Sequence, residues 1–507
     1  VVIDALPAAG PLPHPSRFAD VVMADLAAPG CPAQAELERI ANVGATLHLR
    51  VSGTWQAKPR PPEAGIAGWT HKWYDATGNM VSADAKVGPP ETVQWQAGPA
   101  FMSSDKTGLH VAVDSGAFVA TDDGTLMVRS SGSGLPRWRS QAALHGSDEF
   151  LIDGDRILAR GDSTAGHGGK PLGRSECGAL IAYNLADGAT SVLTEAPVLL
   201  PTQFFKKTHG FPSTVVTGNA IVAAAGADLA VLDRASGKRK WSITLPDGIW
   251  FSPRVLDDAV IAVECPVGAK VERGRVDSAY QVRAIHAYGL ADGKLRWKTA
   301  CVLPDPTQPD RIDPKTGKPS PDRASLKPLT CAAGTVFLIT SSYQCRANDA
   351  FIAAIDAKDG KLRWKTYSPE GNREKIYWSR TDSSGNIVYR DDFLYFVAGF
   401  GNVGAYGSGP VAKFDPATGN RLSITSAPGK GFGACGMSRA TVNWFIKSAQ
   451  TWNDKEFKQV ERLAARGPCG SGGFPAQGMF YVQPSVCDCQ DQSRGFLGMA
   501  SEAPLPI

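Results

Sequence analysis

Short runs of alternating apolar and polar residues recur along the chain, each followed by a turn signal and a second run that often ends in tryptophan. The clearest copy spans residues 354–364 and reads AIDAKDGKLRW. Related copies occupy residues 230–241, 287–297 and 412–422, and weaker ones occupy 127–138 and 182–188. Alternation over a few residues is typical of half-buried strands, and Asp followed by Gly favours a tight turn. Each copy therefore predicts two antiparallel strands joined by a turn.

The copies are spaced like the units of a repeat protein. Their turn glycines are Gly134, Gly188, Gly237, Gly293, Gly360 and Gly419, separated by 54, 49, 56, 67 and 59 residues. Further apolar runs, such as 220–225 and 334–339, precede the copies, so each unit becomes an antiparallel sheet of three or four strands. Such sheets bury both faces when they pack radially, which predicts an all-β fold built as a β-propeller. The tryptophan that follows four of the glycines is expected to pack between neighbouring sheets.

The number of propeller blades follows from how many units the chain contains. Six units are clear between about residues 105 and 425. Residues 435–465 predict a seventh, and residues 476–500 together with a strand at 92–95 predict an eighth. Joining distant parts of the chain in one sheet removes exposed strand edges. We therefore predict an eight-bladed propeller, with seven blades as the alternative.

The first 62 residues differ from the repeats. Residues 20–25 and 46–51 predict strands, residues 34–41 predict a helix between them, and a proline-rich linker follows. This β-α-β order resembles the last third of a Rossmann-type methyltransferase domain, without the glycine-rich loop that binds the cofactor of that fold. We therefore predict a small α/β extension at residues 1–62, which is a remnant or a cap, and a propeller at residues 63–507.

The repeats resemble the PQQ-like, or quinoprotein-type, propeller repeat, in which a strand ends in Ala-x-Asp-x-x-Thr-Gly and continues to a tryptophan. Outside the repeats, a group of large secreted proteins common in Planctomycetes is similar at Lys58-Pro-Arg-Pro61, Trp69-Thr-His71, Val87-Gly-Pro-Pro90 and Gln94-Trp95. The resemblance implies architecture rather than activity, because outer-membrane assembly lipoproteins that are not enzymes carry the same repeat. Many members of the group have Arg-His-His-Asp after the Gln-Trp strand, where this chain has Phe101-Met-Ser-Ser-Asp105, which weakens the case for an enzyme.

Composition narrows the choice of partners and compartment. The net charge is only +4, so the chain lacks the positive field that is typical of nucleic-acid binding. No apolar run reaches 18 residues, so no transmembrane helix is expected. The ten cysteines include no Cys-x-x-Cys motif and predict disulfides in an oxidising compartment, with a tetrathiolate metal site as the alternative. The expected local pairs are Cys331 with Cys345 and Cys265 with Cys301, and the expected location is periplasmic or extracellular.

Aromatic and basic residues cluster at several positions that are expected in loops around the propeller centre. Aromatic rings stack on sugar faces and Arg pairs with carboxylate or sulfate, so an acidic polysaccharide is a suitable ligand. The catalytic candidates are His209, Tyr343 and Arg380, where Arg would neutralise a uronate and His or Tyr would take the α proton. The ligand-binding candidates are His71, Asp75, Trp250, Arg254, Arg346, Trp378 and Arg439. For His71 and Asp75, the alternative is a buried pair that locks its segment onto the propeller.

These observations favour a binding function over an enzymatic one. We predict an exported propeller that acts as a glycan- or protein-binding or assembly module without bound quinone. One alternative is a lyase or hydrolase that acts on acidic or sulfated polysaccharide. A less favoured alternative is a PQQ-dependent dehydrogenase, which would need a calcium site and a tryptophan platform. No cofactor is expected, with a structural calcium ion as the one addition considered, and the expected partner is an acidic polysaccharide or a protein rather than nucleic acid.

Overall fold

Strands account for almost all of the regular structure in the described part of the chain. The computed structural model describes residues 11–98, 111–122, 125–143, 150–160, 180–193, 214–266, 271–272, 275–276, 282–300, 325–341, 351–367, 386–397, 400–402, 406–408, 411–425, 439–447, 451–462, 473–484 and 495–502. These residues contain a single seven-residue helix, and they include no helix long and apolar enough to cross a membrane.

The N-terminal extension folds as a small sheet with a helix on one face. Its elements are β1 (Ala19–Asp25), α1 (Gln34–Ile40), β2 (Ala41–Val51) and β3 (Thr54–Pro59). Strand β1 pairs with β2 in parallel, and β3 pairs with β2 antiparallel. Leu37 and Ile40 of α1 share a buried cluster with Leu47 and Leu49 of β2. The predicted β-α-β order is therefore confirmed.

Eight larger sheets follow in the described part of the chain, and we number them ring sheets 1 to 8. Ring sheet 1 contains β6 (Val111–Asp114), β7 (Ala117–Asp122), β8 (Thr125–Ser130) and β9 (Pro136–Ala143), and ring sheet 2 contains β10 (Phe150–Asp153), β11 (Arg156–Arg160), β12 (Leu180–Asn184) and β13 (Thr190–Val192). Ring sheet 3 contains β14 (Thr214–Thr217), β15 (Ala220–Ala225), β16 (Asp228–Asp233) and β17 (Arg239–Thr244), and ring sheet 4 contains β18 (Gly248–Leu256), β19 (Ala259–Pro266), β22 (Ala284–Gly289) and β23 (Leu295–Thr299).

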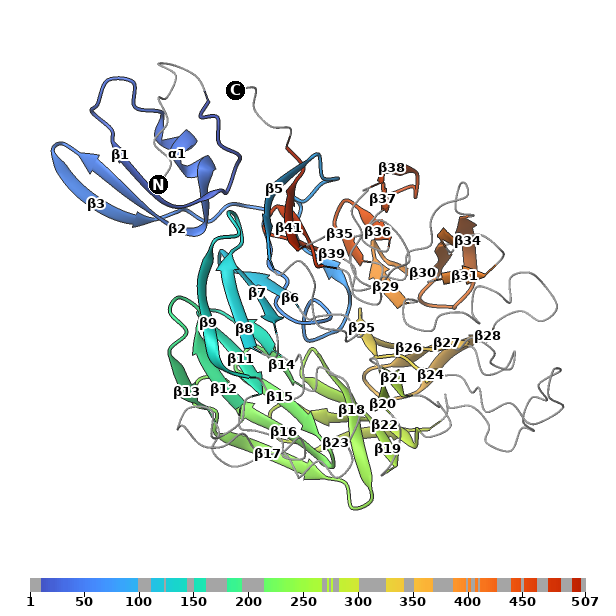
Figure 1. Cartoon of the computed structure of the whole chain (residues 1–507). Helices are drawn as coiled ribbons and strands as arrows, with labels where there is room; N and C mark the ends of the chain where they lie inside the picture. Colours follow the sequence, from blue (N-terminus) through green and yellow to red (C-terminus); the bar gives the residue numbers. More distant parts are fainter. Residues whose placement is uncertain are drawn as a thin grey trace.

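Ring sheets 5 to 8 have the same antiparallel core with a few additions. Ring sheet 5 contains β25 (Thr330–Ala332), β26 (Thr335–Ser341), β27 (Phe351–Asp356) and β28 (Leu362–Tyr367), and it is extended by β20 (Val271–Glu272), β21 (Arg275–Val276) and β24 (Ser325–Leu326). Ring sheet 6 contains β29 (Asn386–Arg390), β30 (Phe393–Val397), β33 (Val411–Phe414) and β34 (Arg421–Thr425), and ring sheet 7 contains β35 (Arg439–Thr441), β36 (Phe445–Lys447), β37 (Thr451–Asn453) and β38 (Gln459–Arg462), joined by β4 (Val81–Ser82). Ring sheet 8 contains β39 (Gly473–Ala476), β40 (Met479–Val482), β41 (Phe496–Ala500) and β5 (Thr92–Ala97). A separate hairpin comprises β31 (Phe400–Asn402) and β32 (Tyr406–Ser408). Figure 1 shows the ring sheets following one another around a common centre.

At five boundaries of the described sheets, the repeated turn joins one sheet to its neighbour through a tryptophan. In ring sheet 5 the Asp356 carboxylate accepts the N–H of Lys358 at 2.8 Å, and Gly360 adopts a φ of +73°. A Cβ atom at Gly360 would lie 2.7 Å from the Trp297 ring of ring sheet 4, so only glycine leaves room for this ring. Trp297 Nε1 donates a hydrogen bond to Ala357 O at 2.8 Å. Equivalent bonds to the next sheet are made by Trp95, Trp138, Trp241 and Trp364. We call these contacts the tryptophan seams, and they confirm the predicted packing.

A strand from the N-terminal side of the chain completes ring sheet 8. Strand β5 pairs antiparallel with β41 at the outer edge of this sheet, which confirms the pairing predicted for residues 92–95. Trp95 of β5 packs against Gly134 and donates to Ser131 O of ring sheet 1 at 2.8 Å. Strand β39 of ring sheet 8 also contacts β6 of ring sheet 1. The last ring sheet is therefore joined to the first by the same type of seam that joins ring sheet 1 to 2, 3 to 4, 4 to 5 and 5 to 6.

One boundary between described sheets has leucine in place of tryptophan. Between ring sheets 2 and 3, Leu193 packs against Gly237. The buried carboxylate of Asp153 in ring sheet 2 accepts hydrogen bonds from Arg156 at 2.7 Å and from Arg234 of ring sheet 3 at 2.6 Å. An ion pair therefore supplements the apolar contact at this boundary.

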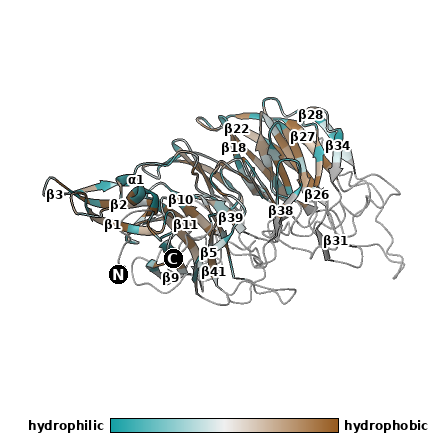
Figure 2. Cartoon of the chain, turned by 90° about the horizontal axis from the view of Figure 1, so that it is seen from above, coloured by the Kyte–Doolittle hydropathy of each residue, from teal (hydrophilic) through white to brown (hydrophobic). Residues whose placement is uncertain are grey.

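Apolar side chains fill the spaces between the ring sheets. Figure 2 shows hydrophobic residues concentrated along strands such as β18, β22, β26 and β27. Cys265 and Cys331 belong to the buried cluster shared by ring sheets 4 and 5. Both are free thiols, and burial raises the pKa of each to about 12. The structure therefore does not support the expected disulfides, whose other members, Cys301 and Cys345, lie outside the described residues.

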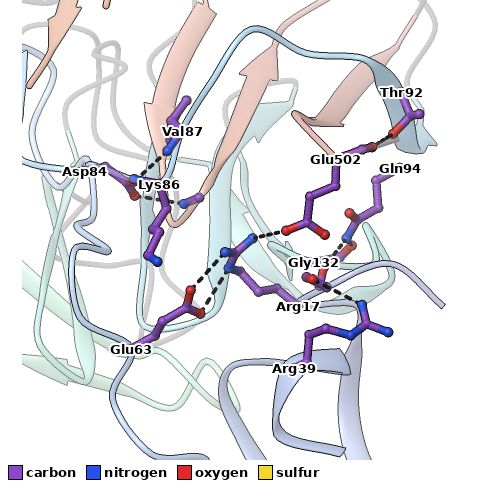
Figure 3. A network of polar contacts seen from close by, with 12 residues as sticks. Arg17, Arg39, Glu63, Asp84, Lys86, Val87, Thr92, Gln94, Gly132 and Glu502 are labelled. Atoms are coloured by element: carbon purple, nitrogen blue, oxygen red, sulfur yellow. Dashed lines mark hydrogen bonds and ion pairs between the residues drawn. The ribbon is translucent and has the colours of Figure 1, made fainter. Parts of the chain in front are cut away.

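The extension is bound to the ring by polar contacts. Asn42 at the start of β2 donates from Nδ2 to Ser130 Oγ of ring sheet 1 at 3.1 Å. Arg17 pairs with Glu63 at 3.0 Å and with Glu502, which follows β41, at 3.7 Å (Figure 3). The extension therefore docks where ring sheets 1 and 8 meet.

Candidate functional site

Residues 67–84 pass through the centre of the ring, and we call them the hub segment. The segment leaves the extension and meets the innermost strands of the ring sheets in chain order (Figure 1). It includes β4, which pairs in parallel with β35 of ring sheet 7. The propeller centre, where ligand-binding loops were expected, is therefore occupied by the chain itself.

Each ring sheet donates a main-chain N–H group to the hub segment. In the order of ring sheets 1 to 8, the bonds are Val113 N–H to Trp69 O (2.9 Å), Ile152 N–H to Thr70 O (3.1 Å), Val216 N–H to His71 Nε2 (3.0 Å), Val255 N–H to Ala76 O (2.9 Å), Cys331 N–H to Thr77 O (2.9 Å), Tyr389 N–H to Asn79 Oδ1 (2.9 Å), Ala440 N–H to Met80 O (3.0 Å) and Gly478 N–H to Asp84 Oδ2 (2.8 Å). Buried main-chain donors need partners, so the hub segment satisfies one inward-facing donor of every ring sheet.

The donors occupy equivalent places in their sheets. In ring sheets 1 to 7, the donor is the penultimate residue of the innermost strand. In ring sheet 8 this place is held by Pro475, which has no N–H group. Gln477 and Gly478 in the following turn donate instead, to Ala67 O and Asp84 Oδ2, both at 2.8 Å. The contact is thus preserved where the sequence removes the usual donor.

His71 is a buried, neutral residue of the hub segment. Its Nε2 accepts the N–H of Val216, so the ring proton lies on Nδ1, which faces Thr70 Oγ1 at 2.8 Å. Burial and then the nearby positive charge of Arg254 lower the pKa of His71 to about 4. At neutral pH the lone pair that a general base would use is therefore already bonded to Val216. This geometry agrees with a side chain that locks its segment onto the propeller.

Asp75 and Arg254 shape a turn of the hub segment. The Asp75 carboxylate accepts the N–H of Thr77 at 2.9 Å and its hydroxyl at 2.6 Å, so Asp75 bonds within its own turn rather than to His71. Arg254 is 1 % exposed and donates from Nε to Leu329 O at 2.9 Å. Burial raises the pKa of Asp75 and lowers that of Arg254 to about 10, while their opposite charges act against both shifts.

The two remaining described candidates are also buried. Arg439 is 2 % exposed and lies over the rings of Trp69 and Phe474, with Cζ 5.2 and 4.2 Å from the two centroids. Burial lowers the pKa of Arg439 to about 9. Trp250 packs edge-on against His286, with ring centroids 5.0 Å apart. A ligand would therefore reach the described candidates only after the hub segment and the strands around it had moved.

The other candidates lie outside the described residues, and their predicted roles stay predictions. They are the three catalytic candidates His209, Tyr343 and Arg380 and the ligand-binding candidates Arg346 and Trp378. The described candidates come together around the hub segment. Trp250 lies between ring sheets 3 and 4, in a buried cluster that also includes Ala76 of the hub segment.

Two important hub residues were not predicted from the sequence. Asn79 accepts the N–H of Tyr389 and donates to its carbonyl, both at 2.9 Å. Asp84 accepts main-chain N–H groups of Ala67, Lys86, Val87 and Gly478, part of which Figure 3 shows. Burial raises the pKa of Asp84. One available signal was the loss of alternation between residues 69 and 84, which marks a segment outside the repeats.

A second buried polar cluster lies in ring sheet 4. His286 faces Glu264 Oε2 at 2.7 Å through Nε2 and Tyr288 Oη at 2.8 Å through Nδ1. Lys298 pairs with Glu264 at 2.9 Å. Burial lowers the pKa of His286 and raises that of Tyr288 to about 12. Polar residues two positions apart in apolar strands could have predicted that these side chains share one face.

A quinone cofactor would need a tryptophan platform and a calcium site. In the described part of the propeller centre, the hub segment bonds to all eight ring sheets. Trp69 of the hub segment is fully buried and contacts both Arg439 and Phe474. The described residues likewise contain no group of three His, Cys, Asp or Glu side chains that could hold a metal ion.

Comparisons with known proteins bear on the ring and the hub segment together. A family model described as outer membrane protein assembly factor BamB matches residues 69–247 and 182–434, which run from the hub segment to just beyond ring sheet 6. The structure of BamB from Moraxella catarrhalis is 12% identical, with a TM-score of 0.45, and the match covers 80% of this chain and 98% of that one. The structure of a europium-containing methanol dehydrogenase is 10% identical, with a TM-score of 0.45, and the match covers 82% of this chain and 89% of that one. The structure of a quinohemoprotein alcohol dehydrogenase from Comamonas testosteroni is 11% identical, with a TM-score of 0.47, and the match covers 88% of this chain and 82% of that one. No curated protein matches the sequence significantly.

Proposed function

Because the chain belongs to the family described as outer membrane protein assembly factor BamB, we propose that it is a quinone-free β-propeller that binds a protein partner. The eight ring sheets would be its blades, with residues 63–507 as the propeller and residues 1–62 as an extension bound to its surface. The propeller would act outside the cytoplasm, in the periplasm or extracellularly. Its role would be that of a rigid binding or assembly module.

The occupied centre is the observation that carries this proposal. A propeller enzyme commonly needs its centre for substrate or cofactor, and here that space holds the hub segment with a bond from every ring sheet. The ring is thereby fixed from inside as well as through the tryptophan seams. What remains for a partner is the outer surface, and large rigid surfaces suit protein recognition.

The buried cations argue for a protein partner over an acidic glycan. Arg254 donates to a main-chain carbonyl, and Arg439 lies against two aromatic rings. Neither guanidinium is exposed to solvent, so neither is available for bidentate pairing with a uronate or sulfate group. Because both guanidinium groups are buried, Arg254 and Arg439 are also unavailable to bind the acidic groups of a lyase substrate.

The quinone-free part of the proposal is tested by titration with pyrroloquinoline quinone and Ca²⁺. We expect no shift in the unfolding temperature and no dye-linked alcohol oxidation, because the hub segment bonds to every ring sheet in the centre. A quinone-dependent thermal shift together with oxidation of an alcohol would overturn the proposal and favour the dehydrogenase.

The partner is tested by site-specific photo-crosslinking of the full chain in its native cells. A photoreactive residue would replace one exposed apolar side chain at a time: Trp55, Val93, Leu295 or Leu422. We expect a discrete protein adduct at one position or at neighbouring positions and none at the others. Equal labelling at all four positions, or adducts that disappear after glycosidase treatment, would argue against a specific protein partner.

A further inference from the structure

The inward-facing N–H groups form a ring of hydrogen-bond donors that does not depend on side chains. All of them belong to the main chain, and seven hold the same place in their sheets. The hub segment meets them in chain order, mostly with its own carbonyl oxygens. Proteins that bind extended peptides use this combination, in which main-chain bonds supply affinity and a few side chains supply specificity.

Three side chains of the hub segment supply contacts that depend on residue type. Asn79 bonds both main-chain groups of Tyr389, His71 accepts the N–H of Val216, and Asp84 accepts that of Gly478. A peptide that lacks one of these groups would leave a buried main-chain donor of the ring without a partner, which costs more than the bond contributes. The ring can therefore distinguish the hub sequence from other extended peptides.

The hub segment is bounded by exposed residues at both ends. Ala64 and Gly65 precede it, Ala85 and Lys86 follow it, and all four are exposed. The two ends also meet, because the N–H of Ala85 donates to Gly65 O at 2.7 Å. Both connections to the rest of the chain thus lie at the surface, although most of the segment between them lies inside.

We propose that the ring is a peptide-binding site, that the hub segment is its peptide held within the same chain, and that the hub segment of a second copy can replace it. The ring contributes main-chain donors, and the peptide contributes carbonyls together with the side chains at positions 71, 79 and 84. Replacement would exchange identical segments between copies, as in domain swapping.

The test uses the full chain with protease recognition sequences inserted after Ala64 and after Ala85. Cleavage releases residues 65–85 as a separate peptide, and we expect this peptide to stay with the ring on size-exclusion chromatography. A fluorescent synthetic peptide of residues 65–85, the sequence that a second copy would offer, is expected to exchange into the ring and to raise the anisotropy signal.

Matched peptides make the result specific. The Asn79→Leu peptide loses both bonds to Tyr389, so it should compete with the labelled peptide about tenfold less well, or worse. The Ala83→Ser peptide changes an exposed residue and should compete like the natural sequence.

Three outcomes would overturn the proposal. They are equal competition by the two variants, loss of the cut peptide without binding of the labelled one, and loss of the circular dichroism signal of the ring on cleavage, which would make the hub segment part of the core.

Discussion

The tryptophan seams and the hub segment both connect neighbouring ring sheets, but they do so by opposite means. The seams repeat one side chain. In each seam, a tryptophan indole N–H donates to a main-chain carbonyl in the turn of the neighbouring sheet, beside a glycine that leaves room for the indole. The hub contacts repeat a main-chain group. Each ring sheet donates at least one N–H from its innermost strand or from the turn after that strand. The acceptors come from a segment that occurs once and has no internal repeat.

This difference separates two kinds of stabilisation in one ring. The seams bury large apolar area between adjacent sheets, which is the dominant favourable term in folding. The hub segment also buries apolar side chains, those of Trp69, Trp73 and Met80, against ring sheets 1 and 8. Its distinctive contribution is to give partners to main-chain donors of all eight ring sheets that would otherwise be buried and unpaired. We therefore expect a seam to matter most for the stability of two neighbouring sheets, and the hub segment to matter for the ring as a whole.

The largest single effect is expected at a seam. Trp297→Ala removes a side chain that is 7 % exposed and the bond to Ala357 O, and leaves a cavity beside Gly360. Such a change in a core costs about 3–5 kcal/mol of unfolding free energy, which urea denaturation followed by circular dichroism would measure. Leu295→Ala, two residues away and 55% exposed, is the control and should change stability by less than about 0.5 kcal/mol. A similar loss in both variants would show that the indole is not a specific connection.

The seams could be predicted from the sequence because side chains encode them. Asp356, Gly360 and Trp364 stand at fixed offsets, and each has a local physical role that the residue type reveals. The closure by β5 was predictable for the same reason, since Trp95 ends an apolar alternating run. The blade-like sheets and the α/β extension therefore followed from pattern alone.

The hub segment could not be predicted because its partners are main-chain groups. Every residue except proline carries an N–H, so nothing in the residue type of Val113 or Ile152 marks it as a hub donor. His71 and Asp75 were predicted as ligand-binding residues, with a buried pair as the alternative, and the structure gives them hydrogen-bond partners in Val216 and Thr77. Sequence reasoning finds a polar side chain more readily than the main-chain group that it contacts.

The second-largest expected effect is a loss of stability at low pH, caused by protonation of His71 in the hub segment. The pKa of His71 is about 4 in the folded protein, below its ordinary value of 6.5. Between these values the unfolded chain binds the proton more strongly, so stability falls as the pH falls, by up to about 3 kcal/mol across the window. Protonation would also place an N–H on Nε2 opposite the N–H of Val216. The measurement is the unfolding free energy between pH 7 and pH 4.

A variant separates this effect from the other titrating groups. His71→Gln keeps an acceptor near Val216 but cannot take up the proton, so it should lose clearly less stability than the natural protein between pH 6.5 and pH 4. Asp75 and Asp84, whose pKa values burial raises, act in the opposite direction in both proteins and cancel in the comparison. Parallel pH profiles for the two proteins would show that His71 does not control the attachment of the hub segment to ring sheet 3.

The smallest effect is expected at the boundary where leucine replaces tryptophan. Leu193 is partly buried against Gly237, and the Asp153 carboxylate, which bonds to Arg156 and Arg234, also connects ring sheets 2 and 3. Leu193→Ala removes only part of a buried side chain and should cost about 1 kcal/mol in the same urea experiment. Leu422→Ala changes an exposed leucine on the outermost strand of ring sheet 6 and should be nearly neutral. If Leu193→Ala were as destabilising as Trp297→Ala, the apolar contact rather than the ion pair would carry this boundary, and leucine would serve as a full seam.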